Sequence, residues 1–180
     1  MDWKLLSRIC SFKTPWIELI GEHWQDDKGQ LLDYWRTTTD DSLIIIPEQS
    51  GDFIFPNKIF RPGVGQMTLD FPGGRVRQGV PINTMAREIL ARELGVTDNS
   101  IIELENIYTD PKFINSSTSS QKLFGLYARL NGTKDDLLPH IRFGSNKSNL
   151  SRILEELQCL QCRALLLELI TCKERFAGIR

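Results

Sequence analysis

A change of hydrophobic period midway along the chain constrains its fold more than any other feature. Before the glycine-rich turn Pro72-Gly73-Gly74, apolar residues come in short runs of strand length. Between residues 82 and 94 they return every three or four positions, which is the spacing of one helix face, and Gly95 follows as a natural stop. The pattern predicts one amphipathic helix, framed by a glycine turn and by Gly95, among several strands.

The apolar runs on both sides of this helix predict strands and turns. Upstream, two pairs of runs are joined by turn-forming residues, at Asp27-Lys28-Gly29 and at Ser50-Gly51-Asp52. The predicted strands cover residues 16–22, 31–37, 42–46, 53–60, 66–71, 101–108 and 123–130. Many strands around one helix, followed by a helical C-terminal part, indicate a mixed α/β layer architecture.

The C-terminal part of the chain has a helical period. Ser148 or Asn149 can cap a long amphipathic helix there. The apolar face of this helix comprises Leu150, Ile153, Leu154, Leu157, Leu160, Ala164, Leu167 and Ile170. We therefore expect one domain over residues 1–140 and, over residues 141–180, a C-terminal amphipathic helix packed on the same domain.

Composition and charge exclude several classes of function. The 180 residues are 41% hydrophobic and 25% charged, which favours a packed core over global disorder. A net charge of −1 and a pI of about 6.1 give no electrostatic reason to expect a nucleic-acid or membrane partner. No apolar run is long enough to span a bilayer, and residues 1–13 lack the pattern of a signal peptide. These features predict a cytoplasmic protein.

The cysteines raise the question of a metal site. There are four of them, Cys10, Cys159, Cys162 and Cys172. Cys159 and Cys162 form one C-x-x-C, but no second pair or histidine cluster accompanies it, and both histidines are remote in the sequence. We interpret the cysteines as thiols within an apolar helix of a cytosolic protein.

The segment from Leu69 to Val96 resembles the Nudix box, G-x5-E-x7-R-E-U-x-E-E-x-G-U, in which U is a bulky aliphatic residue. Gly74 and Gly95 are 21 positions apart, as the first and last glycines of the box require. In Nudix proteins the box is a loop-helix-loop whose helix carboxylates hold divalent metals on a diphosphate. Carboxylates three and four residues apart share one helix face, and such oxygens are the ligands that magnesium prefers.

In this register most carboxylates of the box are replaced. Val80, Ile89 and Arg92 stand where the box has glutamates, and Glu88 stands at the arginine position. Glu93 is the glutamate that survives. The resemblance therefore implies a degenerate catalytic site, and we expect hydrolysis to be weak or lost.

A second register places Arg87-Glu88 on the Arg-Glu of the box and inserts one residue before Gly95. Helix geometry argues against it, because Glu88 lies opposite the apolar stripe whereas Glu93 lies near its middle. We interpret Glu88 as a solvated residue that pairs with Arg92 at i+4. For Glu93 two readings stay open, a functional or metal-binding carboxylate and a structural group satisfied by loop amides.

Flanking segments narrow the resemblance to the ADP-ribose pyrophosphatases. Phe60-Arg61-Pro62 is similar to their Q-Y-R-P segment, and residues 70–74 are similar to their E-x-P-A-G, with aspartate in place of glutamate. Residues 108–128 resemble their loop-then-strand segment, with Gln121 near a position that commonly holds an acid. The resemblance implies a Nudix-type α/β/α sandwich with a mixed sheet, and a homodimer.

The same resemblance implies a set of site residues. Glu93 would be the catalytic residue and, with the Gly73 carbonyl, would bind Mg2+ or Mn2+. The substrate-binding residues would be Arg61, Asp70, Gly74, Arg75 and Gln121. Ordinary readings stay open for two of them, because Arg61 can form a surface ion pair and Asp70 can end a strand at the turn. Arg75, Arg77 and Arg92 would bind phosphate directly or form a solvated basic surface.

Two functions are favoured about equally. The first is a metal-dependent hydrolase of nucleoside diphosphate derivatives, ADP-ribose foremost, with replacement carboxylates such as Asp70, Glu103, Glu105 or Asp110. The second is a non-catalytic regulatory domain that binds a nucleotide or a sugar phosphate. A third hypothesis is a structural protein that docks through its C-terminal helix. Carboxylates that converge on Glu93 would favour the hydrolase, whereas an arginine-lined cleft would favour the binding domain.

Overall fold

The computed structural model describes residues 2–132 and 137–172, which form two compact units. The N-terminal unit comprises residues 2–41 and 112–122, and the sandwich unit comprises residues 42–111 together with the chain from Leu123 onward. The expected domains, 1–140 and 141–180, divide the chain elsewhere. Among the described residues, no helix is long and apolar enough to cross a membrane.

The N-terminal unit is built on a three-stranded antiparallel sheet. Its strands are β1 (Lys4–Lys13), β2 (Glu18–Gln25) and β3 (Leu31–Thr38), in that order across the sheet. The predicted hairpin between β2 and β3 is confirmed, and the Asp26 carboxylate accepts the N–H groups of Lys28 and Gln30 in its turn. Strand β1 was not predicted from the sequence, and all of its residues are exposed. The short strand β10 (Lys112–Phe113) also belongs to this unit.

The sandwich unit contains a mixed sheet. Four strands run in the order β11 (Lys122–Leu130), β4 (Ser42–Gln49), β5 (Asp52–Pro56) and β12 (His140–Gly144). The pair β11–β4 is parallel, and the other pairs are antiparallel, including β9 (Ile101–Asn106) on β11 and β8 (Gly73–Arg75) on β4. A separate hairpin joins β6 (Ile59–Arg61) to β7 (Gln66–Thr68).

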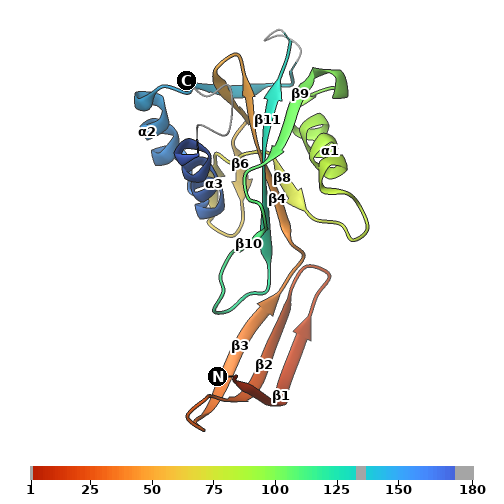
Figure 1. The fold of residues 1–180 in the computed structure, drawn as a ribbon, viewed down its shortest axis with the longest axis vertical. Coiled ribbons are helices and arrows are strands. Elements are labelled where there is room, and N and C mark those ends of the chain that lie inside the picture. Colours follow the sequence, from red (N-terminus) through yellow and green to blue (C-terminus); the bar gives the residue numbers. More distant parts are fainter. Residues whose placement is uncertain (1, 133–136, 173–180) are drawn as a thin grey trace. The chain divides into compact units, whose positions relative to one another are not determined.

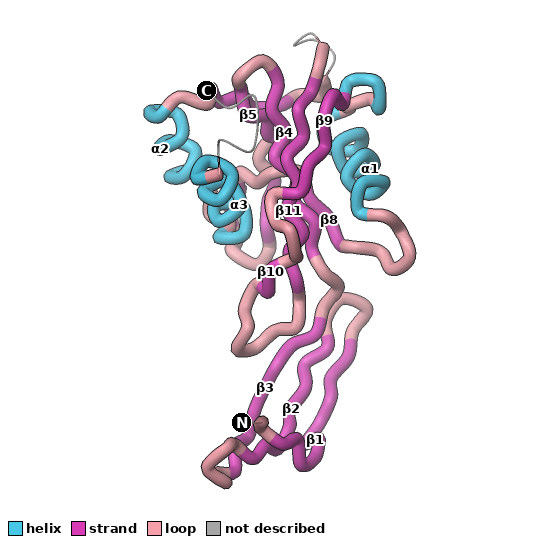
Figure 2. The backbone as a smooth tube through the Cα atoms, viewed as in Figure 1, coloured by secondary structure: helices cyan, strands magenta, loops and turns pink. Residues whose placement is uncertain are grey.

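Helices cover both faces of this sheet (Figures 1 and 2). Helix α1 (Ile82–Leu94) packs on one face, and α2 (Lys147–Glu156) and α3 (Leu160–Thr171) pack on the other. Successive side chains of β4 point to opposite faces, so Leu43 and Ile45 join the α1 core while Ile44 and Ile46 join the α2–α3 core. The predicted α/β/α sandwich with a mixed sheet is confirmed.

The central helix has the predicted bounds. It begins at Ile82, ends at Leu94, and buries Met85, Ala86, Ile89, Leu90 and Leu94. Gly95 follows with a left-handed φ of 71°, and its N–H bonds back to the helix. A side chain would be strained in this conformation, which is why glycine ends the helix here.

The prediction of one long C-terminal helix is wrong, because two helices form there. Asn146, rather than Ser148 or Asn149, caps α2, and its side chain accepts the N–H of Asn149 at 3.0 Å. The chain turns extended at Leu157, which is 1% exposed and forms a parallel β-bridge with Leu69. The burial of Leu157 beside Leu69, distant in sequence, outweighs the local helical period.

Candidate functional site

Close packing of the glycine-rich turn against the sheet fixes its position. Gly73 and Gly74 lie in β8 opposite Ile44 and Leu43 of β4. A Cβ atom on Gly73 would lie 2.9 Å from the carbonyl oxygen of Leu43, a contact that backbone cannot relieve cheaply. Glycine is therefore required there by the approach of the two strands.

The last turns of α1 face this glycine turn. A Cβ atom on Gly74 would lie 3.3 Å from Ile89 Cδ1 and 3.7 Å from Arg92 Nη2. The Gly73 N–H donates to Glu93 Oε2 at 3.4 Å. Three positions of the box, 89, 92 and 93, therefore surround the turn in the ungapped register.

Arg92 joins the two groups that were expected to bind a metal. Its Nη2 donates to Glu93 Oε1 at 2.6 Å and to the Gly73 carbonyl oxygen at 3.2 Å. The Glu93 side chain is 25% exposed, whereas that of Arg92 is 59% exposed. A guanidinium thus supplies the positive charge at the carbonyl and at the carboxylate of the box.

This donor set does not fit a magnesium ion. Magnesium requires a near-octahedral shell of oxygens, and the helix supplies one carboxylate. Both expected donors, Gly73 and Glu93, already accept bonds from a cation, and a second cation beside Arg92 would be repelled.

A second charged pair stands near the turn. Arg61 Nε donates to Asp70 Oδ2 at 2.8 Å, and Thr68 Oγ1 donates to the same oxygen at 2.9 Å. The Asp70 side chain is largely buried, while that of Arg61 is half exposed. The ion pair considered for Arg61 is therefore present, and Asp70 is its partner.

Both charged groups line one cavity of about 960 Å³. Its walls are largely apolar and come from β4, the β6–β7 hairpin, the glycine turn and the start of α3. We call it the glycine-turn cavity. Its size falls within the range of small-molecule sites, about 300–1,000 Å³, and a mainly apolar lining with a few convergent polar groups is typical of such sites.

Six of the seven predicted site residues meet at this cavity. Arg61, Asp70, Gly73, Gly74, Arg75 and Glu93 line it. The seventh, Gln121, lies in the N-terminal unit, where its Nε2 donates to the Asp40 carbonyl at 2.9 Å. Of the described residues that line the cavity, Asp70 and Glu93 carry carboxylates.

The other candidate carboxylates lie elsewhere. Glu103 forms an ion pair with Arg129 at 2.8 Å, and Glu88 pairs with Arg77. The predicted pairing of Glu88 with Arg92 is wrong, because Arg92 turns toward the glycine turn instead. Glu88 itself is 52% exposed, which agrees with its reading as a solvated residue.

Cys159 and Cys162, which were interpreted as thiols within an apolar helix and not as site residues, also line the cavity. Cys159 precedes the first residue of α3, and Cys162 is 2% exposed in its first turn. A hydrogen bond from Cys162 and N–H groups of the first helical turn lower the pKa of Cys159, whereas this bond and burial raise the pKa of Cys162. The C-x-x-C spacing itself was the available signal.

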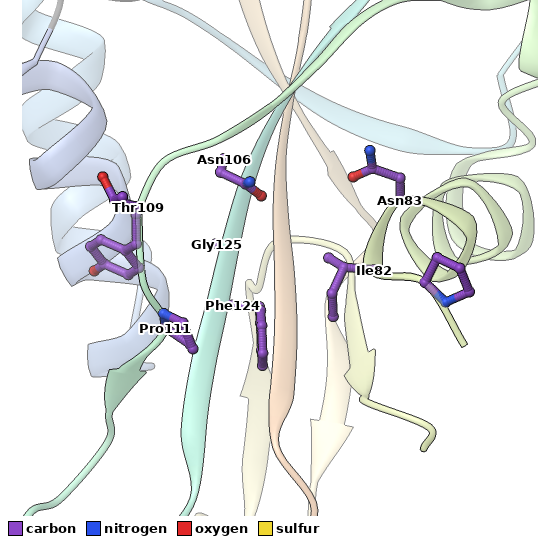
Figure 3. A pocket seen from close by; sticks show the side chains of 9 residues that line it. Ile82, Asn83, Asn106, Thr109, Pro111, Phe124 and Gly125 are labelled. Carbon is purple, nitrogen blue, oxygen red and sulfur yellow. The ribbon is translucent and has the colours of Figure 1, made fainter. Parts of the chain in front are cut away.

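A smaller pocket of about 280 Å³ lies between α1 and the ends of β9 and β11 (Figure 3). Asn83 on α1 and Asn106 on β9 line it, together with Phe124. It shares no lining residue with the glycine-turn cavity. None of the predicted site residues lies there.

Comparison with known proteins gives a relative in sequence and a solved structure of similar fold. No protein-family model matches the chain. An uncharacterized Nudix hydrolase of Schizosaccharomyces pombe (strain 972 / ATCC 24843) is 26% identical over 123 residues, which are 62% of this chain and 60% of that relative. The match therefore spans less than two thirds of the relative's length.

A solved structure extends the likeness to the fold of the whole chain. The crystal structure of an ADP compounds hydrolase superposes with a TM-score of 0.80 at 15% identity, covering 100% of this chain and 98% of that one. The chain is therefore similar in sequence to a Nudix hydrolase over part of its length, and it shares the fold of an ADP compounds hydrolase.

Proposed function

We propose that the chain binds a nucleoside diphosphate derivative of the ADP-ribose type in the glycine-turn cavity, and that its hydrolysis is weak or lost. The contact of Arg92 with both Gly73 and Glu93 carries this proposal. In a metal-dependent hydrolase these oxygens would be the ligands of the ion. Here a side-chain cation takes that place.

Arginine side chains provide what a diphosphate needs. A guanidinium has five N–H donors in a rigid fork that matches phosphate oxygens. Arg92 uses Nη2 for its two bonds, so its remaining nitrogens can donate to a phosphate group. Arg61 and Arg75 line the glycine-turn cavity and add positive charge, while Arg92 contacts Gly73 and Glu93 in its wall.

The apolar wall suits the rest of such a ligand. Ile59, Pro62 and Val64 of the β6–β7 hairpin line the cavity. A nucleobase offers a flat apolar face to a wall of this kind. The diphosphate would then face Arg92 and Arg75, and the remainder of the ligand would contact the hairpin.

Calorimetry with ADP-ribose tests the binding half of the proposal. Binding is expected both with magnesium and with excess EDTA. Arg92→Ala removes charge-assisted hydrogen bonds worth about 1.5–3 kcal/mol and should weaken binding about ten- to a hundredfold. Glu88→Gln, an exposed position on the same helix, is the matched control. The absence of binding heat with every nucleoside diphosphate sugar would contradict the binding half of the proposal.

A turnover assay tests the catalytic half. The chain should hydrolyse ADP-ribose far more slowly than an intact Nudix enzyme, while Ile89→Glu combined with Arg92→Glu should raise both magnesium affinity and activity. Ile89 is 4% exposed, so the double variant also requires a thermal melt to show that it folds. Robust magnesium-dependent hydrolysis by the unaltered chain, abolished by Glu88→Gln, would support the other register and the hydrolase hypothesis.

The proposal includes a homodimer formed through the N-terminal sheet. That sheet exposes several large apolar side chains, among them Leu5, Leu6, Ile9, Phe12 and Trp35. Exposed apolar patches of this kind mark interaction surfaces, and the resemblance to ADP-ribose pyrophosphatases names a second copy as the occupant. Sedimentation equilibrium should give twice the mass of one chain, and Phe12→Asp should lower it. A monomer over the micromolar range would contradict this part.

A further inference from the structure

Three potential metal ligands meet in the wall of the glycine-turn cavity. They are Asp70, Cys159 and Cys162, and their ligand atoms all lie within 4.8 Å of one another. Asp70 precedes the glycine turn, while the two cysteines flank the start of α3. Residues distant in the sequence therefore converge at this point.

We propose that Asp70, Cys159 and Cys162 form a binding site for a thiophilic divalent cation, with zinc as the ion that fits it best. Tetrahedral zinc holds sulfur at about 2.3 Å and carboxylate oxygen at about 2.0–2.2 Å, which places ligand atoms about 3.5–3.8 Å apart. The observed ligand atoms lie within 4.8 Å of one another, so a bound ion would draw them closer together. The site goes beyond nucleotide binding and does not depend on it.

The chemical type of the metal ligands distinguishes this site from the Nudix box. Thiolates select zinc and other soft ions, whereas magnesium selects oxygens. Two sulfurs with one carboxylate are a poor magnesium site and a good zinc site. The cation proposed here is thus a different ion from the one that the box would hold, and it has different ligands.

The backbone holds the three donors together. The β-bridge between Leu69 and Leu157 pairs the residue just before Asp70 with a residue two positions before Cys159. Leu69 and Leu157 are both 1% exposed, so core packing secures this bridge. The same bridge that divides α2 from α3 therefore brings the C-x-x-C to Asp70.

Hydrogen bonds also orient the carboxylate. Arg61 and Thr68 both donate to Asp70 Oδ2, which leaves the second carboxylate oxygen to offer to a cation. Carboxylates that bind metals are commonly fixed by such outer partners. Arg61 has a second effect, because its charge helps to balance two thiolates, a carboxylate and a divalent cation near neutrality.

Three protein ligands leave one tetrahedral position open. Asp70, Cys159 and Cys162 all line the glycine-turn cavity, so the fourth position is within reach of water or of a ligand oxygen. Zinc sites with three protein ligands and an open position are the reactive kind, whereas purely structural sites have four.

A redox-active dithiol is the competing use of a C-x-x-C at a helix start. The carboxylate of Asp70 argues for the metal. Asp70 places a carboxylate oxygen within 4.8 Å of both sulfurs, which gives the cluster a third potential ligand. A metal site requires such a third donor, whereas a disulfide has no use for it.

Metal titration of the full chain, reduced and free of nucleotide, tests the site directly. We expect one zinc per chain by competition with a chromophoric chelator, and cobalt should give the near-ultraviolet absorption of a sulfur-to-cobalt charge transfer. Cys159→Ser should abolish both signals. Outer partners of metal ligands alone are worth about 10- to 100-fold in affinity, so Asp70→Asn should weaken binding at least about tenfold.

Matched controls keep these results interpretable. Cys10→Ser and Cys172→Ser remove the two cysteines outside the cluster and should leave zinc binding unchanged. Cys162 is buried, so its variant can fail to fold, and the test therefore relies on Cys159 and Asp70. Zinc should raise the melting temperature of the parent chain and leave that of Cys159→Ser unchanged.

Two outcomes would overturn the proposal. One is a zinc affinity that stays the same in Cys159→Ser. The other is a reduced chain that binds no zinc, and a Cys159–Cys162 disulfide in the untreated chain would then assign the pair to redox chemistry. Because no nucleotide is present, neither outcome bears on ligand binding by the arginines.

Discussion

The two units of the chain reach stability in different ways. The sandwich unit buries apolar side chains on both faces of its sheet, in two separate cores. Among the described residues of the N-terminal unit, only Ile20, Gly21 and Glu22 are buried. One unit thus depends on apolar burial, whereas the other depends on backbone pairing around a buried charge.

Glu22 is the centre of the N-terminal unit. Arg36 donates to both of its carboxylate oxygens, at 2.9 and 3.0 Å, and Trp24 Nε1 donates at 3.1 Å. Hydrogen bonding by Arg36 holds the pKa of Glu22 below its ordinary value of 4.5. The N-terminal sheet thus surrounds one well-satisfied buried charge and leaves large apolar side chains exposed, so we expect this charge to organise it.

The largest expected effect is the cost of replacing a buried leucine of the sandwich unit by alanine, compared with the same replacement in the N-terminal unit. Leu165 is fully buried, and its side chain occupies the space that a Cβ atom on Gly125 would need. Leu165→Ala should cost about 2–5 kcal/mol in the free energy of unfolding. Leu5→Ala, at a position 48% exposed on β1, should change it by less than about 0.5 kcal/mol. Urea unfolding measures both, and equal costs would erase the contrast.

Removal of the buried charge should follow in size. Glu22→Gln leaves Arg36 facing a neutral partner and should cost the N-terminal unit about 3 kcal/mol. Hydrogen exchange of the β2 amides reports this unit separately. Unchanged protection of β2, with the sandwich unit also unchanged, would show that the charge does not organise the sheet.

The pH dependence of the N-terminal unit also tests whether the charge of Glu22 stabilises its sheet. The folded-state pKa of Glu22 is depressed, so its stabilising contribution is complete above about pH 4.5, the value for the unfolded chain. That contribution is lost as the pH falls through the lower, folded-state pKa. Acid should therefore open β2 before it opens β4, and Glu22→Gln should make the opening of β2 independent of pH in this range.

A buried polar pair in the sandwich unit should have a smaller effect. Tyr127 donates its hydroxyl to Glu48 Oε2 at 3.0 Å, and both residues are buried. Burial and Glu48 raise the pKa of this tyrosine. Tyr127→Phe leaves the carboxylate short of one donor and should cost about 1–3 kcal/mol in urea unfolding. A cost above that of Leu165→Ala would contradict the view that apolar burial dominates this unit.

The smallest effect is expected at Glu88. Its ion pair with Arg77 is half exposed on both sides, and such pairs contribute about 0–1 kcal/mol. Glu88→Gln should barely shift the melting temperature in low salt. A large loss would mean that this carboxylate has a role beyond the helix surface.

Features set by neighbouring residues could be predicted from the sequence. The helix from Ile82 to Leu94 follows from its own period and from Gly95, and the hairpin between β2 and β3 follows from its turn residues. The grouping of Arg61, Asp70 and Glu93 was predicted from the resemblance, because matching positions of two proteins with the same fold lie at matching places in space.

Features set by distant contacts could not be predicted. The break at Leu157 depends on Leu69, and the metal-binding cluster depends on Asp70 meeting a C-x-x-C far along the chain. The direction of the Arg92 side chain depends on a carbonyl in the glycine turn. In each case a residue distant in the sequence decides the local structure or the direction of a side chain. The period of the apolar residues along the chain does not identify that distant residue.

The position of Arg92 has a consequence for how the cavity would respond inside a cell. A bound ion is shared with every other ligand in solution, so its occupancy changes with the concentration of free metal. A guanidinium attached to the chain is present once per cavity and can be neither chelated nor diluted. For a chain that binds as proposed, the fraction of filled cavities would follow the concentration of the nucleotide and would not depend on free magnesium.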